Sequence, residues 1–251
     1  ATAQLQASQA VIDRIADKWS LSRDALDDFA FASHQRAAAA SDAGYFDNEI
    51  VPVAVEELRE LELTESVAVL RQDETIRRDT SREKLSTLKT SFRPDTGRIT
   101  AGNSSQISDG AAALLLMSAD TAKKLGLRAR ARVVAFTTVG SDPTLMLTGP
   151  MAATRKVLGK AGLNINDIDL FEVNEAFASV PLAWMQETGV SHDKLNVNGG
   201  AIALGHPLGA SGARLMTTLL NELERRGGRF GLQAICCAGG MGTATIIERL
   251  D

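Results

Sequence analysis

The chain has 251 residues, of which 44% are hydrophobic and 23% are charged, as expected for a globular protein with a sizeable core. Its net charge of −4 disfavours nucleic acid as the main partner, and no apolar run reaches the roughly 18 residues that suggest a membrane span. The two cysteines, Cys236 and Cys237, are adjacent. Adjacent cysteines rarely form a structural disulfide, so they indicate a reducing compartment, here the cytoplasm. No CxxC or HExxH motif indicates a metal site.

The amino-terminal part of the sequence predicts helices joined by loops. Apolar residues recur at helical spacing from Asp24 to Ala43, with Ser22 as the expected N-cap and Gly44 as the stop. A short edge strand is expected over residues 49–53. Residues 56–100 are rich in charged side chains, which indicates a solvated excursion in which a minority of the charges face the phosphates of a ligand.

From Asp109 onward, strand and helix patterns alternate along the chain. We expect strands over residues 111–117, 132–138, 169–173, 232–237 and 244–249, and helices over residues 118–126, 149–162, 174–188 and 208–226. The first of these strands, 111–117, is apolar throughout and is expected to be buried. Alternating strands and helices predict a layered α/β domain.

A histidine lies in the glycine-rich segment from Asn198 to Ala213. His206 follows Gly205 and precedes Pro207, just before a predicted helix. Because proline fixes the local φ angle, the imidazole should be held in one direction. Such a histidine can exchange protons near neutral pH or donate a hydrogen bond to a developing oxyanion. Capping of the following helix is the other interpretation.

Cys236 and Cys237 end an apolar strand and precede a glycine turn, where α/β folds place active sites. Their side chains should point to opposite faces of the sheet, so one of them can face a given pocket. The N–H groups of the turn and a nearby histidine would lower the pKa of a thiol there. Two small buried apolar residues are the alternative.

Two further polar segments are candidates for binding. Asn174 lies where a strand becomes a helix; it fits an N-cap, or an amide that positions a water or a carbonyl. The loop over residues 100–110 carries small polar side chains that can hydrogen-bond a ligand, although this is also an ordinary loop composition. No dinucleotide-binding glycine motif or Walker A lysine accompanies these segments.

Together and in this order, these segments resemble the thiolase family. The resemblance rests on residues 101–105 with 109–112, 174–178, 205–213 and 236–242. Residues 22–37 and 46–53 are also similar to the loop domain of that family. The resemblance implies an α/β, thiolase-like layered α-β-α-β-α fold, of which this chain would hold the coenzyme A (CoA)-covering loop domain, residues 1–107, and core residues 108–251, the end of the N-terminal half plus the C-terminal half.

The same resemblance implies the activity and the partners. We expect an acyl-CoA acyltransferase of fatty acid metabolism and β-oxidation, which cleaves 3-ketoacyl-CoA by thiolysis or condenses two acyl-CoAs in the reverse Claisen reaction. Acyl-CoA and CoA would be substrates, with no tightly bound cofactor. The family suggests a homodimer or homotetramer.

By position in the motifs, the resemblance also assigns roles to residues. His206 corresponds to the histidine that activates the nucleophile, and Cys236 to the acid/base cysteine. Asn174 corresponds to the residue that holds a water in an oxyanion hole shared with His206. The backbone N–H of Ala238 falls where a glycine N–H commonly completes the second hole.

Two further residues are assigned to CoA, Ser105 near the pantetheine arm and Lys89 near the adenine. The nucleophilic cysteine of the family would precede residue 1, because no cysteine occurs before Cys236. We therefore expect residues 1–251 alone to be inactive. A decarboxylating ketoacyl synthase of the same fold and a non-catalytic CoA-binding module remain as alternatives. The acyl-chain length is not readable, although residues 145–147 would help to shape that pocket.

Overall fold

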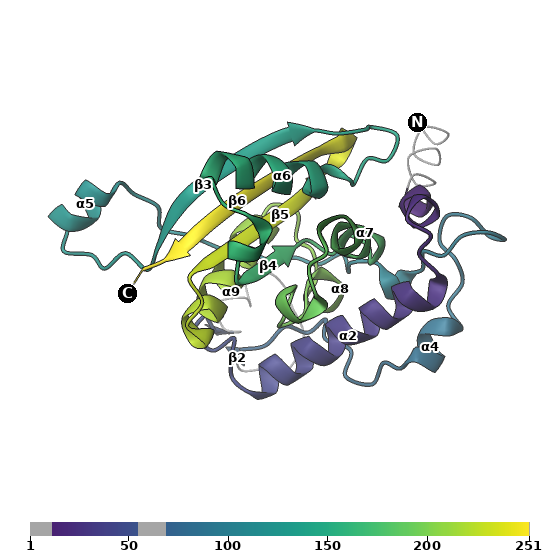
Figure 1. The fold of residues 1–251 in the computed structure, drawn as a ribbon. Helices are drawn as coiled ribbons and strands as arrows, with labels where there is room; N and C mark the ends of the chain where they lie inside the picture. The colour runs from purple at the N-terminus through teal and green to yellow at the C-terminus, as the bar shows by residue number, and fades with distance from the viewer. Residues whose placement is uncertain (1–11, 55–68, 251) are drawn as a thin grey trace.

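A four-stranded sheet forms the centre of the fold in the computed structural model, which describes residues 12–54 and 69–250 (Figure 1). The strand order is β3 (Ala131–Gly140), β6 (Met241–Arg249), β5 (Phe230–Cys237) and β4 (Leu170–Val173). β6 pairs antiparallel with β3 and with β5, whereas β4 pairs parallel with β5. The parallel pair brings the carboxyl ends of β4 and β5, and the residues that follow them, to the same edge of the sheet.

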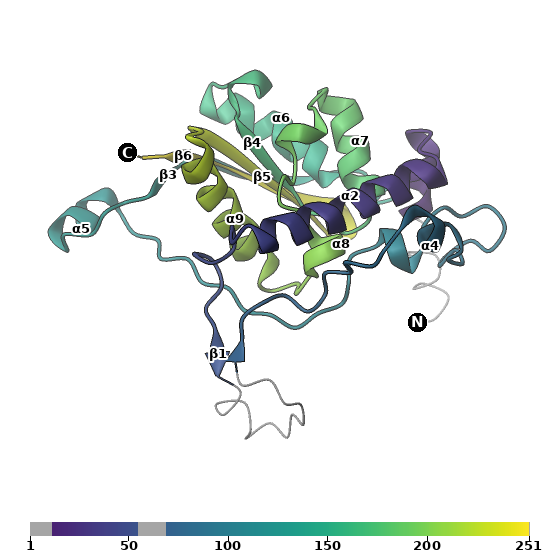
Figure 2. The same cartoon turned by 90° about the horizontal axis from the view of Figure 1, so that it is seen from below.

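Helices cover both faces of this sheet (Figures 1 and 2). The helices α6 (Gly149–Ala161) and α7 (Ser179–Thr188) share one buried apolar cluster with Leu232 and Ala234 of β5. The helix α9 (Ser211–Arg226) packs on the opposite face, where Leu219 and Leu223 lie so close to Gly231 that a Cβ at that position would meet both side chains. The sheet is therefore a middle layer between two helical layers.

A second close approach fixes the start of α6 against the start of β6. A Cβ on Gly149 would overlap the backbone of Met241 and Gly242, and a Cβ on Gly242 would overlap the backbone of Gly149. Because two backbones touch here, only glycine fits on either side.

The helix α2 (Arg23–Asp42) lies below the sheet domain in Figure 1, beside α7 and the short helix α8 (Ala201–Leu204). Ser22 caps it, with its hydroxyl oxygen 3.0 Å from the N–H of Ala25. The short helix α4 (Arg82–Ser86) packs against α2. Short 3-10 turns connect the larger elements: η2 (Ala101–Asn103), η3 (Ile165–Asp167), η4 (His192–Lys194) and η5 (Ala238–Gly240).

Two segments stand away from this body. The small hairpin of β1 (Val53–Ala54) and β2 (Val69–Leu70) projects downward in Figure 2, and α5 (Ala119–Lys124) sits on an arm beside the sheet. Among the described residues, no helix is both long enough and apolar enough to cross a bilayer.

Most predicted elements are confirmed within a few residues. The helix after Ser22, the helix at 149–162 and four of the five strands are present, and the helix expected at 118–126 is α5. Of the edge strand expected over 49–53, only Val53 lies in a strand, as the first residue of β1. Part of the charged stretch, residues 56–68, lies outside the described residues.

Two predicted elements are wrong. Residues 111–117 are not a buried strand: they are extended, no described strand pairs with them, and Leu115 and Leu116 are 80% and 74% exposed. An apolar run predicts burial, but burial requires a partner layer, and none of the described elements covers this run. The start of the helix expected from residue 174 is also wrong, because α7 begins only at Ser179. The long helix expected over residues 208–226 is present as α9, which begins at Ser211.

Candidate active site

The backbone around His206 is fixed on both sides. Gly205 has a φ angle of 83°, in the left-handed region that favours glycine, and a Cβ there would overlap the side chain of Ser108. The N–H of His206 donates to the carbonyl oxygen of Gln106 at 3.0 Å. Pro207 begins the turn into α9, because its carbonyl accepts from the N–H of Ser211 at 2.9 Å. The direction of the imidazole is thus set by the chain itself.

The hydrogen bonds of the imidazole define its tautomer. The Ser211 hydroxyl donates to the Pro207 carbonyl at 3.0 Å and lies 2.6 Å from Nδ1 of His206. Since the single hydroxyl proton is used on Pro207, Nδ1 carries the ring proton and donates it to Ser211. The other nitrogen, Nε2, then accepts from Nδ2 of Asn174 at 3.2 Å. Burial, assisted by the positive charge of Arg214, lowers the pKa of His206 below its usual value and keeps the ring neutral at pH 7.

This arrangement predicts that Ser211 sets the tautomer. In a Ser211→Ala variant, Nδ1–H loses its acceptor, a loss of about 1 kcal/mol that shifts the tautomer ratio roughly fivefold toward Nε2–H. The ring nitrogen chemical shifts of His206 measure this ratio directly. Thr217→Val is the matched control, because it removes a hydroxyl from the same helix that donates to the Ala213 carbonyl instead. An unchanged ratio in the Ser211 variant contradicts the assignment.

Asn174 joins His206 to Cys236. It follows β4 directly, and its backbone N–H donates to the Ala234 carbonyl of β5 at 3.0 Å. Besides its hydrogen bond with His206, its side chain interacts with the thiol of Cys236, which lowers the pKa of that thiol. The amide group has two N–H donors, so it can serve both partners at once. Asn174 is fully buried and lies five residues before α7, so its interpretation as the N-cap of that helix is wrong.

The thiol of Cys236 is 7% exposed and belongs to the apolar cluster beneath α6 and α7, whereas Cys237 is partly exposed and outside that cluster. Burial raises the pKa of the Cys236 thiol to about 12, and the hydrogen bonds from its own backbone and from Asn174 offset only part of this effect. The expectation of a lowered thiol pKa is therefore wrong in direction. At neutral pH Cys236 is a thiol that can give a proton away.

Ala238, the predicted second oxyanion donor, begins the turn η5 two residues after Cys236. The turn needs left-handed backbone at Gly239 and Gly240, with φ angles of 73° and 84°. This places the Ala238 backbone at the same end of β5 as Cys236. Its role as a donor stays a prediction.

A separate cavity of about 150 Å³ lies between α2, α4 and the loop that begins with η2. It is lined by His34, Arg77, Asp79, Thr80, Lys84, Leu85, Leu88, Ala101, Gly102, Ser104, Gln106 and Ile202. Two of these side chains, Arg77 and Lys84, are cations from the charged stretch. Of the two residues predicted to contact CoA, Ser105 lies between the lining residues Ser104 and Gln106, while Lys89 is exposed and is not part of the lining.

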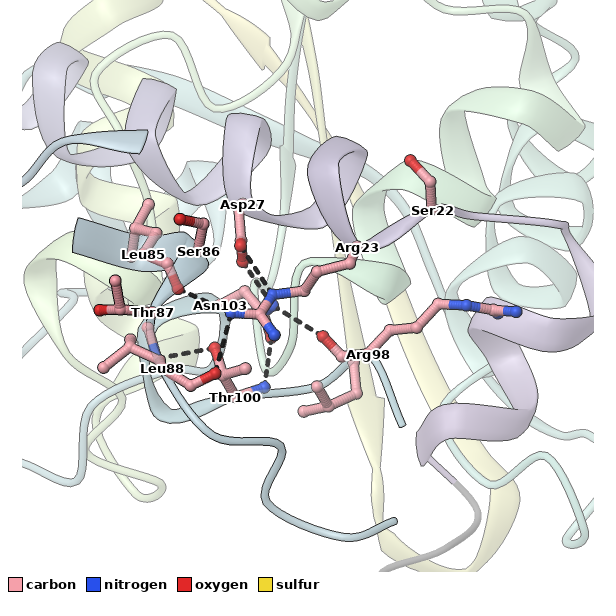
Figure 3. Close-up of polar contacts among 12 residues, drawn as sticks. Ser22, Arg23, Asp27, Leu85, Ser86, Thr87, Leu88, Arg98, Thr100 and Asn103 are labelled. Atoms are coloured by element: carbon pink, nitrogen blue, oxygen red, sulfur yellow. Dashed lines mark hydrogen bonds and ion pairs between the residues drawn. The ribbon is translucent and has the colours of Figure 1, made fainter. Parts of the chain in front are cut away.

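Buried polar contacts hold the wall of this cavity in place (Figure 3). Arg23 of α2 donates to Asp27 at 2.6 Å and to the carbonyl oxygens of Leu85 and Leu88 at 2.6 and 3.1 Å. Asn103 donates to Asp27 at 2.8 Å, and its own side-chain oxygen accepts from the Thr100 N–H at 2.9 Å. The Asp27 carboxylate thereby links α2 to α4 through Arg23, and to the loop with η2 through Asn103.

His34 lies in the same wall. Its Nδ1 accepts from the backbone N–H of Arg77 at 3.1 Å, which fixes the segment that presents Arg77 to the cavity. Burial is the main reason that the pKa of His34 falls to about 4. The imidazole is therefore neutral at pH 7 and remains an acceptor.

Sequence reasoning missed several of these residues. Arg77 and Lys84 could be found only as members of a charged stretch, and Gln106 only as part of a polar loop. Ser211 is five residues after His206 in the glycine-rich segment, so it was visible as a hydroxyl near the first turn of a helix but not as a partner of the ring.

Two family profiles match this chain. Residues 5–120 match the profile described as "Thiolase, N-terminal domain", and residues 127–249 match "Thiolase, C-terminal domain". The chain belongs to the thiolase family. The matched family agrees with the thiolase-like α/β fold of the sheet and its two helical layers.

Curated relatives and solved structures of this family are similar over most of the chain. A 3-ketoacyl-CoA thiolase of Serratia proteamaculans is 48% identical over 244 residues, which cover 95% of this chain and 61% of the relative. A steroid 3-ketoacyl-CoA thiolase, FadA6, of Mycobacterium tuberculosis is 50% identical, with 94% and 55% covered. The acetyl-CoA acetyltransferase of Bacillus anthracis has a TM-score of 0.89 at 40% identity, with 96% and 60% covered.

A human mitochondrial 3-ketoacyl-CoA thiolase solved in complex with CoA gives a TM-score of 0.85 at 39% identity, with 96% of this chain and 58% of that chain covered. This thiolase-family chain therefore spans about 60% of the length of the relatives that it matches.

Proposed function

We propose that the chain is the acid/base and CoA-facing part of an acyl-CoA acyltransferase that cleaves 3-ketoacyl-CoA by thiolysis or runs the reverse Claisen condensation. The observation that carries the proposal is the Asn174 side chain, which hydrogen-bonds His206 and also interacts with the thiol of Cys236. An imidazole nitrogen, an amide and a thiol from three separate segments thus meet at one end of the sheet.

The protonation states suit this chemistry. Nε2 of neutral His206 can take a proton from a thiol that attacks the substrate, and the imidazolium that results can donate to an oxyanion. When the carbon–carbon bond of a 3-ketoacyl thioester breaks, an enolate is left whose α-carbon needs a proton. The neutral thiol of Cys236 can supply it.

The nucleophile is the second part of the proposal. Neither cysteine of the chain fits the role of the acyl-accepting nucleophile. Cys236 is assigned as the acid/base group, and Cys237 lies outside the apolar cluster that holds Cys236. We propose that the acyl-accepting cysteine comes from polypeptide outside residues 1–251 and that these residues alone are inactive. Thiolysis of acetoacetyl-CoA by the 251-residue chain, followed through the loss of the substrate's absorbance, tests this; turnover above the blank contradicts it.

The cavity with Arg77 and Lys84 is the proposed binding place of the phosphate-bearing adenine end of CoA, and Ser105 of the adjacent pantetheine arm. Residues 1–107 would form the covering loop domain and residues 108–251 the core. Lys84 is paired with Asp79 of the same lining at 2.7 Å, so Arg77 is the side chain that supports an anionic ligand. The relative solved with CoA supports CoA as that ligand.

Replacing Arg77 tests this placement. We expect Arg77→Met to weaken CoA binding roughly fivefold or more, because a charge-assisted contact to phosphate is removed from the cavity. Lys89→Met is the matched control: Lys89 is exposed and outside the lining, so its effect should stay within about twofold. Isothermal titration calorimetry measures both. A larger effect at Lys89 would restore the role that the sequence predicted for it.

The proposal extends to the assembly and location of the protein. Two free cysteines support a reducing compartment, which we propose to be the cytoplasm, and family membership supports a homodimer or homotetramer. Light scattering of the purified protein measures the molar mass; a monomer at micromolar concentration contradicts the assembly.

A further inference from the structure

One side chain lies between the proposed CoA cavity and His206. Gln106 follows η2, and its Nε2 donates to two backbone carbonyl oxygens, that of Thr75 at 2.7 Å and that of Ile202 at 2.9 Å. Its backbone carbonyl oxygen accepts from the backbone N–H of His206 at 3.0 Å. Gln106 is also one of the residues that line the cavity.

The partners of Gln106 on the cavity side belong to the segment that presents Arg77. The Thr75 hydroxyl donates to the Ala203 carbonyl at 2.7 Å, which ties this segment to α8. Nη2 of Arg77 lies 3.5 Å from Oε1 of Gln106. A ligand that draws the Arg77 side chain toward its phosphates therefore acts on the amide oxygen of Gln106 and on the chain two residues before Arg77.

The partners on the other side lead to the candidate acid/base centre. Ile202 is fully buried in α8 and lies four residues before His206. Both hydrogens of the Gln106 amide are used on carbonyl groups, and an unpaired buried carbonyl is unfavourable, so the amide resists separation from either partner. His206 itself is not among the residues that line the cavity. A ligand confined to the cavity can reach His206 only through the protein.

We propose that Gln106 is a positioning residue that couples occupation of the cavity by the phosphate-bearing adenine end of an acyl-CoA to the placement of the His206 imidazole. The inference rests on the proposed function. It adds to that function a residue that makes the acid/base centre respond to a bound substrate.

The three histidines of the chain make the coupling measurable in one NMR spectrum of the imidazole nitrogens. His34 lines the cavity and reports binding directly, whereas His192 stacks on Phe29 with ring centroids 4.7 Å apart and serves as the reference. The probe is adenosine 3′,5′-bisphosphate, which lacks the pantetheine arm and so cannot touch His206. In the unaltered chain, the imidazole nitrogen shifts of His34 and His206 should move with the same midpoint, and those of His192 should stay.

The decisive variant is Gln106→Met, which keeps the side-chain length and removes both amide functions. His34 should still respond, with a midpoint raised no more than about tenfold, while the His206 response should fall to less than about a third. Thr154→Val is the stability-matched control, because it removes the buried acceptor of the Trp184 indole N–H on α6 and α7; its His206 response should equal that of the unaltered chain.

The outcomes distinguish a failure of the coupling role of Gln106 from a failure of the proposed CoA cavity. A His206 response in Gln106→Met equal to that of the unaltered chain overturns the coupling role, as does a His206 that never responds while His34 does. If neither CoA nor the bisphosphate moves His34 in the unaltered chain, the proposed CoA cavity itself is wrong, and the coupling falls with it.

Discussion

A Cys236→Ala variant of the proposed acyltransferase is expected to lose about 10²- to 10⁴-fold in the exchange of α-protons of acetyl-CoA with solvent deuterium, because general acid–base catalysis by one group is typically of that size. The thiol of Cys236 is the proposed proton donor beside Asn174, and the other thiol of β5, Cys237, lies outside the apolar cluster that holds Cys236. Acyl transfer to the nucleophilic cysteine should persist. Proton exchange is followed by NMR and acyl transfer by the mass of the acyl-enzyme.

The adjacent cysteine provides the control for this prediction. Cys237→Ala also removes a thiol from β5, but this side chain lies outside the apolar cluster that holds Cys236. It should alter exchange by less than about threefold. Loss of both exchange and acyl transfer in Cys236→Ala would assign the residue a structural role instead.

The second large effect concerns stability and arises at Asn103. Asn103→Leu removes the donor to the Asp27 carboxylate and to the Arg98 carbonyl, and the acceptor of the Thr100 N–H (Figure 3). Asp27 is 4% exposed, so its oxygen loses a partner that water cannot easily replace. We expect the free energy of unfolding to fall by about 3 kcal/mol.

Urea denaturation followed by circular dichroism measures this change. Asn221→Leu is the control, because Asn221 is only partly buried; it donates to the Thr217 carbonyl of its own helix and accepts from the Arg130 side chain in an exposed contact. Its cost should stay below about 1 kcal/mol. Equal decreases in the free energy of unfolding of both variants would show that the hydrogen bonds around Asp27 contribute no more to stability than an ordinary bond within a helix.

The sequence predicts elements well where local chemistry defines their ends. Ser22 caps α2, and Gly162 ends α6 with a φ angle of 66°, as their positions beside apolar periodicity indicate. It fails where the outcome depends on a distant partner. Residues 111–117 have the composition of a buried strand, but no described layer covers them.

The candidate site shows the same division. The resemblance selected His206, Cys236 and Asn174, and the structure brings them together: Asn174 hydrogen-bonds His206 and interacts with the Cys236 thiol. The pKa direction at Cys236 could not be predicted, because it depends on how deeply the end of β5 is buried. Gln106 could not be found either, since its partners are backbone carbonyls about thirty and about a hundred positions away along the chain.

The backbone contact between Gly149 and Gly242 limits which positions of this protein can vary. Neither glycine can be replaced, even by alanine, without moving a strand or a helix. These two positions beside the turn after Cys236 therefore cannot vary. Changes in chain-length preference must then come from more yielding neighbours, such as the loop with Leu145 and Met146 just before α6. Sequence changes would therefore accumulate in the loop before α6, while Gly149 and Gly242 stay the same.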